Sequence, residues 1–152
     1  MDLDVKELGF SQTSVSYEKR RKLLGGEEIK YTYDDIKDNL YNNGWPKDEF
    51  VDAIIMPPDG KLTCIDNTRL TAIHELGGVD KHGNPIKAKV RVRRPDEDLG
   101  PKEIYRFTDL EKGFEPKKWW EVTRERIRNQ TPKRSGQEYR IEGVPRVSNR
   151  PQ

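Results

Sequence analysis

The sequence predicts an α+β domain in which short strands and helices share one small core. The mostly apolar segments at residues 51–56 and 62–65 have the length of buried strands. Residues 86–92 alternate apolar with basic side chains, the period of a half-buried strand. Helical spacing of apolar residues appears in three other segments, between Thr32 and Gly44, at 68–76 and at 119–129. The two kinds of pattern together define the class.

The composition fits one domain with a modest core. The chain has 152 residues, of which 32% are hydrophobic and 37% are charged. This length suits a single domain, and so low an apolar fraction leaves part of the chain to loops and tails. We therefore expect an acidic N-terminal lead (1–8), a domain (9–130) with its core motif at 51–93, and a basic C-terminal tail (131–152).

Charge, cysteine content and hydropathy exclude several classes of protein. The 29 basic and 27 acidic residues give a formal net charge of +2, too balanced for nucleic-acid binding through bulk charge alone. The lone Cys64 excludes an internal disulfide and a thiolate metal cluster. No apolar run approaches the roughly 20 residues that span a bilayer, and the N-terminus lacks a signal-peptide pattern. We therefore expect no membrane span.

The first helix has the clearest local signal. Thr32 precedes Asp35 by three positions, the spacing of a capping box in which a hydroxyl and a carboxylate satisfy free backbone N–H groups. Ile36 and Leu40 continue an apolar face, and Gly44 is a natural stop. The helix should therefore lie between Thr32 and Gly44.

Residues 51–76 predict a hairpin that leads directly into a helix. The strands at 51–56 and 62–65 flank Pro57-Pro58-Asp59-Gly60, a strong turn signal. The helix predicted at 68–76 ends at Gly77-Gly78, and its apolar face carries Leu70, Ile73 and Leu76. A strand thus runs through a very short loop into a helix.

Basic side chains gather on three further segments. Lys89 and Arg91 belong to the cationic face of strand 86–92, which either holds a nucleic-acid backbone or protects an edge strand from aggregation. The basic run at 18–22 is either a solvated face or part of a binding patch. Past a loop at 95–101, the last helix should turn inward with Trp120, Thr123 and Ile127.

The tryptophans of the last helix have two interpretations. Trp119 and Trp120 stand beside Lys117, Lys118 and Arg124, so a ring could stack on a base while the cations hold the backbone. Alternatively, at least one of these large rings fills the core, because the chain has few other large apolar residues.

The loop Asp66-Asn67-Thr68-Arg69 carries the strongest chemical signal. Because it joins a strand to the first turn of a helix, it directs unpaired backbone N–H groups at one point, which attracts anions. Arg69 adds a guanidinium fork suited to phosphate, and Asn67 and Thr68 supply neutral donors and acceptors. Asp66 is the carboxylate that could take a proton or bind a divalent cation, the one cofactor we consider. The alternative is that the loop only caps the helix.

The segment from Ile54 to Ala72 resembles the core motif of the ParB/sulfiredoxin superfamily. In that motif an Asp-Gly turn, an apolar strand, a short polar box ending in arginine, and a helix with alanine three residues later form a phosphate or nucleotide site. The residues that match the motif, its continuation and its N-terminal segment are Asp59-Gly60, 61–69, Ala72, Gly77, 86–92 and Phe10-Ser11-Gln12-Thr13-Ser14-Val15. The resemblance covers residues 9–93 and implies a ParB/sulfiredoxin-like small mixed sheet with helices, with Gln12 and Ser14 in the wall of the site.

The Asp-Asn-Thr-Arg form of the box is similar to that of ParB-like nuclease domains at the C-termini of polymorphic, contact-dependent bacterial toxins. The Gly44-Trp45 pair and the basic, tryptophan-rich last helix fit the same group. The resemblance implies a nuclease delivered as part of a larger secreted toxin. It would act on nucleic acid in the cytoplasm of a target cell and be neutralised by a cognate immunity protein. We expect the free domain to be a monomer.

This interpretation assigns a role to each candidate residue. The catalytic candidates are Asp66, Asn67, Thr68 and Arg69. The candidates for substrate binding are Gln12, Ser14, His74, Lys89, Arg91, Trp119 and Arg124, of which His74 either faces the phosphate as a proton donor or faces solvent. Two other functions stay open: a nucleotide switch or phosphotransferase that holds ATP or CTP in the same loop, and a non-enzymatic interaction module.

Overall fold

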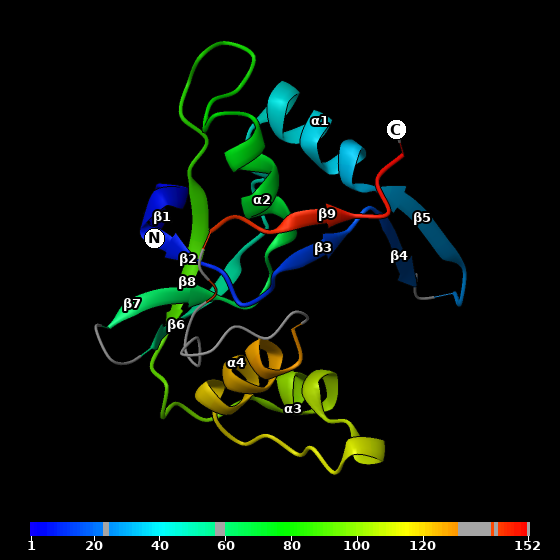
Figure 1. The fold of residues 1–152 in the computed structure, drawn as a ribbon, viewed down its shortest axis with the longest axis vertical. Helices are drawn as coiled ribbons and strands as arrows, with labels where there is room; N and C mark the ends of the chain where they lie inside the picture. The colour runs from blue at the N-terminus through cyan, green and yellow to red at the C-terminus, as the bar shows by residue number, and fades with distance from the viewer. Residues whose placement is uncertain (23–24, 57–59, 131–140, 142, 152) are drawn as a thin grey trace.

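The computed structural model describes residues 1–22, 25–56, 60–130, 141 and 143–151. Within them, one five-stranded mixed sheet lies between two helical layers, which confirms the α+β class. Helices α1 (Tyr33–Asn43) and α2 (Thr68–Glu75) cover one face, and α3 (Pro101–Phe107) and α4 (Trp119–Arg128) cover the other (Figure 1). No helix among these residues is long and apolar enough to cross a bilayer.

The predicted hairpin forms the centre of the sheet. Strands β6 (Val51–Met56) and β7 (Lys61–Cys64) pair antiparallel, and the predicted turn at 57–59 lies outside the described residues. The remaining strands add to both sides, giving the order β1-β8-β6-β7-β2, with β1 (Asp2–Leu3), β2 (Leu8–Gly9) and β8 (Ala88–Arg93). Because β8 runs parallel to β6 and β1 pairs with its first two residues, β8 is not an open edge there.

The two helices next to the site begin and end where local chemistry predicts. The Thr32 hydroxyl accepts from the Asp35 N–H at 3.2 Å, and the Asp35 carboxylate accepts from the Thr32 N–H at 2.8 Å. Gly44 ends α1 with a φ of 75°, a conformation that glycine adopts without strain. Leu70 and Ile73 of α2 are buried, as their spacing predicts.

The two faces of β6 belong to different cores. Val51 and Ala53 pack toward α1 and α2, whereas Ile54 and Met56 pack toward α3 and α4. This division follows from the period of two along a strand, and it explains why apolar residues fill successive positions from Ala53 to Met56. Cys64 of β7 is fully buried, and burial raises the pKa of its thiol.

The inward face of α4 carries Thr123 and Ile127, as predicted, but its tryptophan is Trp119 and not Trp120. The Trp119 side chain is only 1% exposed, whereas Trp120, predicted to face inward, is 37% exposed. Because an α-helix has 3.6 residues per turn, Trp119 shares a face with Val122, Thr123 and Ile127, at the i+3, i+4 and i+8 positions. The short helix α3 was not predicted, because none of its residues is buried.

Segments near both ends of the chain form strands of the fold, whereas the sequence predicted an acidic lead and a basic tail. Near the N-terminus, the 3₁₀ helix η1 (Val5–Glu7) and strand β2 bury Val5 and Leu8 in the first core. Near the C-terminus, β9 (Arg146–Ser148) pairs parallel with β3 (Ser14–Ser16), so these two segments lie side by side (Figure 1). Of the predicted tail at 131–152, residues 131–140, 142 and 152 lie outside the described residues.

A second hairpin stands beside the main sheet and carries the basic run. Strands β4 (Glu18–Lys22) and β5 (Glu28–Thr32) pair antiparallel with each other, and β5 leads directly into α1. In Figure 1 this hairpin extends to the side of the central sheet. Its base therefore lies close to the start of α1. The 3₁₀ helix η2 (Leu110–Lys112) completes the described elements between α3 and α4.

Arg150 ties the C-terminal segment to α1 and α2. Its guanidinium donates to the Glu75 carboxylate at 2.8 Å and to Asp34 at 3.0 Å, and it lies 5.1 Å from the centre of the Tyr33 ring. The hydrogen bond from Arg150 and, after it, that from Lys37 lower the pKa of Glu75 from its usual 4.5 to about 2. The folded state therefore favours the ionised form of Glu75, and the ionised carboxylate in turn stabilises the folded state.

We expect Arg150→Ala to destabilise the protein in a pH-dependent way. At pH 7 the thermal midpoint should fall by about 2–4 °C, because a surface ion-pair network contributes about 1 kcal/mol or less. A carboxylate with a lowered pKa stabilises the fold above its unfolded value, so the difference from wild type should shrink as the pH falls from 4.5 towards 2. Thermal denaturation across this range, with Arg128→Ala as the control, checks this. A difference that persists unchanged at pH 2 would contradict it.

Candidate functional site

The predicted box lies in a pocket where β7 ends and α2 begins. All four of its residues, 66–69, line a cavity of about 310 Å³, which we call the box pocket. Its other walls come from distant parts of the chain, namely Gln12, Lys19 of β4, Tyr31 of β5, Ile36 of α1, Val51 of β6 and Arg126 of α4. The pocket therefore exists only in the folded chain.

The charges around the box pocket favour an anion. Its lining holds three cations, Lys19, Arg69 and Arg126, against one carboxylate, Asp66. The Asn67 side chain makes no capping hydrogen bond to α2, so it does not occupy the N–H groups of the first turn. A positive balance of side chains next to a helix N-terminus is the arrangement that proteins use to hold phosphate.

Asp66 lies among three cationic groups. Arg106 of α3 donates to its Oδ1 at 2.8 Å, and this carboxylate is 44% exposed. Burial lowers the pKa of Lys19, and the charge of Asp66 opposes this shift. Burial likewise lowers the pKa of Arg126, whose guanidinium donates to the Ile65 carbonyl at 2.6 Å, and Asp66 again opposes the shift. Asp66 is thus the negative centre of a cationic cluster.

Asn67 has a structural position inside the box. Its side chain is 1% exposed. Its Oδ1 accepts from the Ser11 N–H at 2.9 Å, and its Nδ2 donates to the Ile65 carbonyl at 2.8 Å and to Gln12 at 3.0 Å. These contacts fasten the segment 10–12 to the end of β7, so this amide holds the wall of the pocket together.

Arg69 and Thr68 face the pocket from the first turn of α2. The Arg69 guanidinium lies 5.8 Å from the centre of the Trp45 ring, and its Nη1 is 3.7 Å from the Glu49 carboxylate. Both side chains are half-buried, so Arg69 is positioned by its neighbours and still meets the cavity. The Gly44-Trp45 pair, which the family resemblance singled out, thereby supports the box directly.

The candidates for the pocket wall, Gln12 and Ser14, and for the proton donor, His74, do not all lie at the box pocket. Gln12 lines the pocket, whereas Ser14 lies on β3 opposite Arg146 and outside the lining. His74 turns away from the box, contrary to the suggested contact with phosphate. Its ring packs 5.5 Å from that of Phe10, it hydrogen-bonds the backbone of Val5, and burial lowers its pKa. Six residues past the start of α2, it faces the N-terminal segment instead.

The substrate-binding candidates of the basic strand and of the last helix, Lys89, Arg91, Trp119 and Arg124, do not line the box pocket. Lys89 donates to the Lys47 carbonyl at 2.7 Å, and Arg91 lies 3.3 Å from the Asp52 carboxylate. Arg124 lies 5.7 Å from the centre of the Trp120 ring. Trp119 offers no face to a base, because it is packed in the second core. These residues could meet a substrate only outside the pocket.

Three cations at the site were not predicted as site residues. Lys19 belongs to the basic run whose role stayed open, and Arg126 was one of several arginines on the last helix. Arg106 comes from the unpredicted α3. Of the three, only Lys19 had a signal in the sequence, namely the basic run at 18–22. All three side chains approach Asp66 from positions about 40 to 60 residues away in the chain, and local sequence patterns do not encode such contacts.

The residues around Asp66 do not fit a divalent cation. Among the described residues, no group of three or more His, Cys, Asp or Glu side chains could hold a metal ion. Asp66 is the only carboxylate in the lining, and Arg106 already occupies its Oδ1. Divalent cations favour sites with several oxygen ligands, whereas this lining is mostly cationic.

Comparison of the chain with protein-family models, with curated proteins and with solved structures gives no match. The functional assignment therefore rests on the pocket and on the sequence motif.

Proposed function

We propose that this protein is a ParB/sulfiredoxin-like domain that cleaves phosphodiester bonds in nucleic acid. The observation that carries the proposal is the box pocket, in which Lys19 and Arg126 join the residues 66–69 that resemble the family's phosphate site, giving three cations and one carboxylate. The order of a strand, a short polar box and a helix supports the same family, as does Trp45 under Arg69.

The cations bind and stabilise the phosphate in the proposed reaction. Arg69 and the first-turn N–H groups of α2 hold two of its oxygens, since a guanidinium fork and a helix N-terminus both suit an anion. Arg126 and Lys19, which also line the pocket, stabilise the charge that develops when a fifth oxygen approaches phosphorus. Arg106 holds the Asp66 carboxylate in place.

Asp66 is the proposed general base. A hydroxyl, either from water or from the sugar, forms the new bond to phosphorus, and its proton passes to Asp66. The bond from phosphorus to the leaving oxygen breaks, and that oxygen takes a proton from Lys19. A lysine whose pKa is lowered by burial gives up its proton more readily, which suits this role.

The biological setting of the proposal follows from the resemblance to polymorphic toxins. A small monomeric domain with this activity would act in the cytoplasm of a target cell after delivery by a larger secreted protein. A cognate immunity protein would protect the producing cell. Covering the box pocket would suffice for neutralisation, because the proposed reaction takes place there.

Cleavage assays on plasmid DNA, total RNA and tRNA test the proposal. We expect wild type to cleave at least one substrate and Arg126→Ala to lose most of this activity. The Arg128→Ala variant should keep the cleavage activity, because Arg128 is exposed and lies two residues further along the same helix. Cleavage should also persist in EDTA, because the described residues offer no metal site. Loss of all activity in EDTA, restored by magnesium, would contradict the proposed chemistry.

A nucleotide-binding function is the second candidate. Tyr31, Ile36 and Val51 form an apolar wall beside the cations, so the pocket combines surfaces for a base and for phosphates. If the protein cleaves no nucleic acid but ATP or CTP raises its thermal midpoint, and Arg69→Ala removes that shift, this function is favoured instead.

A further inference from the structure

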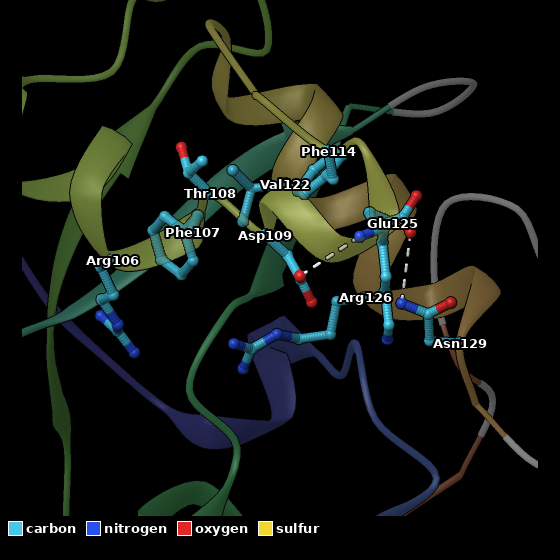
Figure 2. A pocket seen from close by; sticks show the side chains of 10 residues that line it. Arg106, Phe107, Thr108, Asp109, Phe114, Val122, Glu125, Arg126 and Asn129 are labelled. Carbon is cyan, nitrogen blue, oxygen red and sulfur yellow. Dashed lines mark hydrogen bonds between the residues drawn. The ribbon is translucent and has the colours of Figure 1, made fainter.

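A second cavity lies on the other side of Arg126, between α3, η2 and α4. It also has a volume of about 310 Å³, and we call it the helix pocket. Its apolar lining includes Phe107, Phe114 and Val122, and its polar lining includes Glu125 and Asn129 (Figure 2). None of these side chains takes part in the reaction proposed above.

Two arginines connect the helix pocket to the box pocket. Arg126 lines both cavities. Arg106 lines the helix pocket and donates to the Asp66 carboxylate of the box pocket at 2.8 Å. In Figure 2 these two side chains extend along the lower side of the cavity, below Phe107. A ligand that fills both cavities must therefore pass the two guanidinium groups.

The lining of the helix pocket suits an unpaired nucleobase. Phe107 and Phe114 are half-buried, so both keep exposed surface for contact with a flat apolar ring. The Asn129 amide and the Glu125 carboxylate, joined by a hydrogen bond of 3.3 Å, offer donors and acceptors to the edge of a base. Aromatic surface beside cations is the combination with which proteins hold single-stranded nucleic acid.

We propose that the helix pocket binds the base next to the scissile phosphate, so that the substrate is a single strand spanning both cavities. This inference rests on the proposed function and names its substrate class. The phosphate lies in the box pocket, the chain passes Arg126 and Arg106, and the adjacent base enters between Phe107 and Phe114. A base held there is unpaired, so a duplex does not fit.

Binding measurements on short oligonucleotides test this inference. The probes are ribose 5-phosphate, which has a phosphate and no base, and a dinucleotide whose 2′-O-methyl sugars and phosphorothioate linkage resist cleavage. We expect wild type to bind the dinucleotide at least about 10-fold more tightly than ribose 5-phosphate, since stacking of one base contributes about 1–3 kcal/mol. Phe114→Ala should lose most of this gain while its affinity for ribose 5-phosphate stays the same.

Two further variants separate binding from folding. Tyr105→Ala is the matched control, because this aromatic side chain is 89% exposed and lies outside the helix pocket, next to Arg106 in α3. It should bind both probes as wild type does. Asn129→Ala changes an exposed lining residue at the end of α4 and should weaken dinucleotide binding even if Phe114→Ala lowers the thermal midpoint.

The outcomes for the helix pocket and for the nuclease are distinguishable. Equal affinity of wild type for the two probes, or equal losses in Phe114→Ala and Tyr105→Ala, would overturn the base-binding inference even if the protein cleaves nucleic acid. A dinucleotide gain that depends on Phe114 and Asn129, with no cleavage of any substrate, would support base binding and contradict the nuclease proposal.

Discussion

Replacing Asp66 by asparagine is expected to lower the rate of cleavage by about 100-fold or more, the usual contribution of a general base. The substitution removes the group that accepts the proton and keeps an oxygen that can still accept from Arg106. Single-turnover rates with excess enzyme measure this effect without a contribution from product release. The folded state should be largely unaffected, since Asp66 is partly exposed.

The control for this experiment is Asp38→Asn, which changes an exposed carboxylate of α1 to the same amide. It should cleave at the wild-type rate. If Asp66→Asn keeps more than about a tenth of the activity while it is fully folded, the carboxylate is not the base. Arg69→Ala then tells whether the cations of the box pocket alone carry the reaction, because this variant should still lose phosphate binding.

Replacing Asn67 by alanine is expected to act on stability rather than directly on chemistry. The change leaves the buried N–H of Ser11 without its acceptor, and it removes the hydrogen bonds from Asn67 to Gln12 and to the Ile65 carbonyl, which keeps its bond from Arg126. An unpaired buried group costs about 1–3 kcal/mol and each other lost hydrogen bond about 0.5–1.5 kcal/mol, so we expect a loss of about 3 kcal/mol in the free energy of unfolding. For a domain of this size, this corresponds to a fall of roughly 10 °C in the thermal midpoint.

Chemical and thermal denaturation, together with cleavage rates measured well below the midpoint, distinguish a structural Asn67 from a catalytic one. Asn39→Ala is the control, since Asn39 is exposed and, among the described residues, its side chain bonds only the nearby Asn43. An Asn67→Ala protein with wild-type stability and no activity would show that the amide acts on the substrate. The hydrogen bonds of Asn67 favour the opposite result.

The sequence by itself determined the elements that local chemistry defines. The capping box at Thr32 and the stop at Gly44 set the bounds of α1, because helix ends satisfy their own N–H groups with nearby side chains. The apolar run at Val51–Met56 and the helix after Asn67 were likewise correct, and so was the position of the box between them. These signals lie within a few residues of the structure they describe.

Only the tertiary structure decided which side chains meet at the site. Lys19, Arg106 and Arg126 approach Asp66 from a separate hairpin and from two helices on the far face of the sheet. The pairing of β3 with β9 joins segments more than 130 residues apart, and Trp119 rather than Trp120 is buried because it packs in the core with Ile54 and Met56. Such contacts form when elements pack to bury their apolar faces, and no pattern within one element records which partner it will meet.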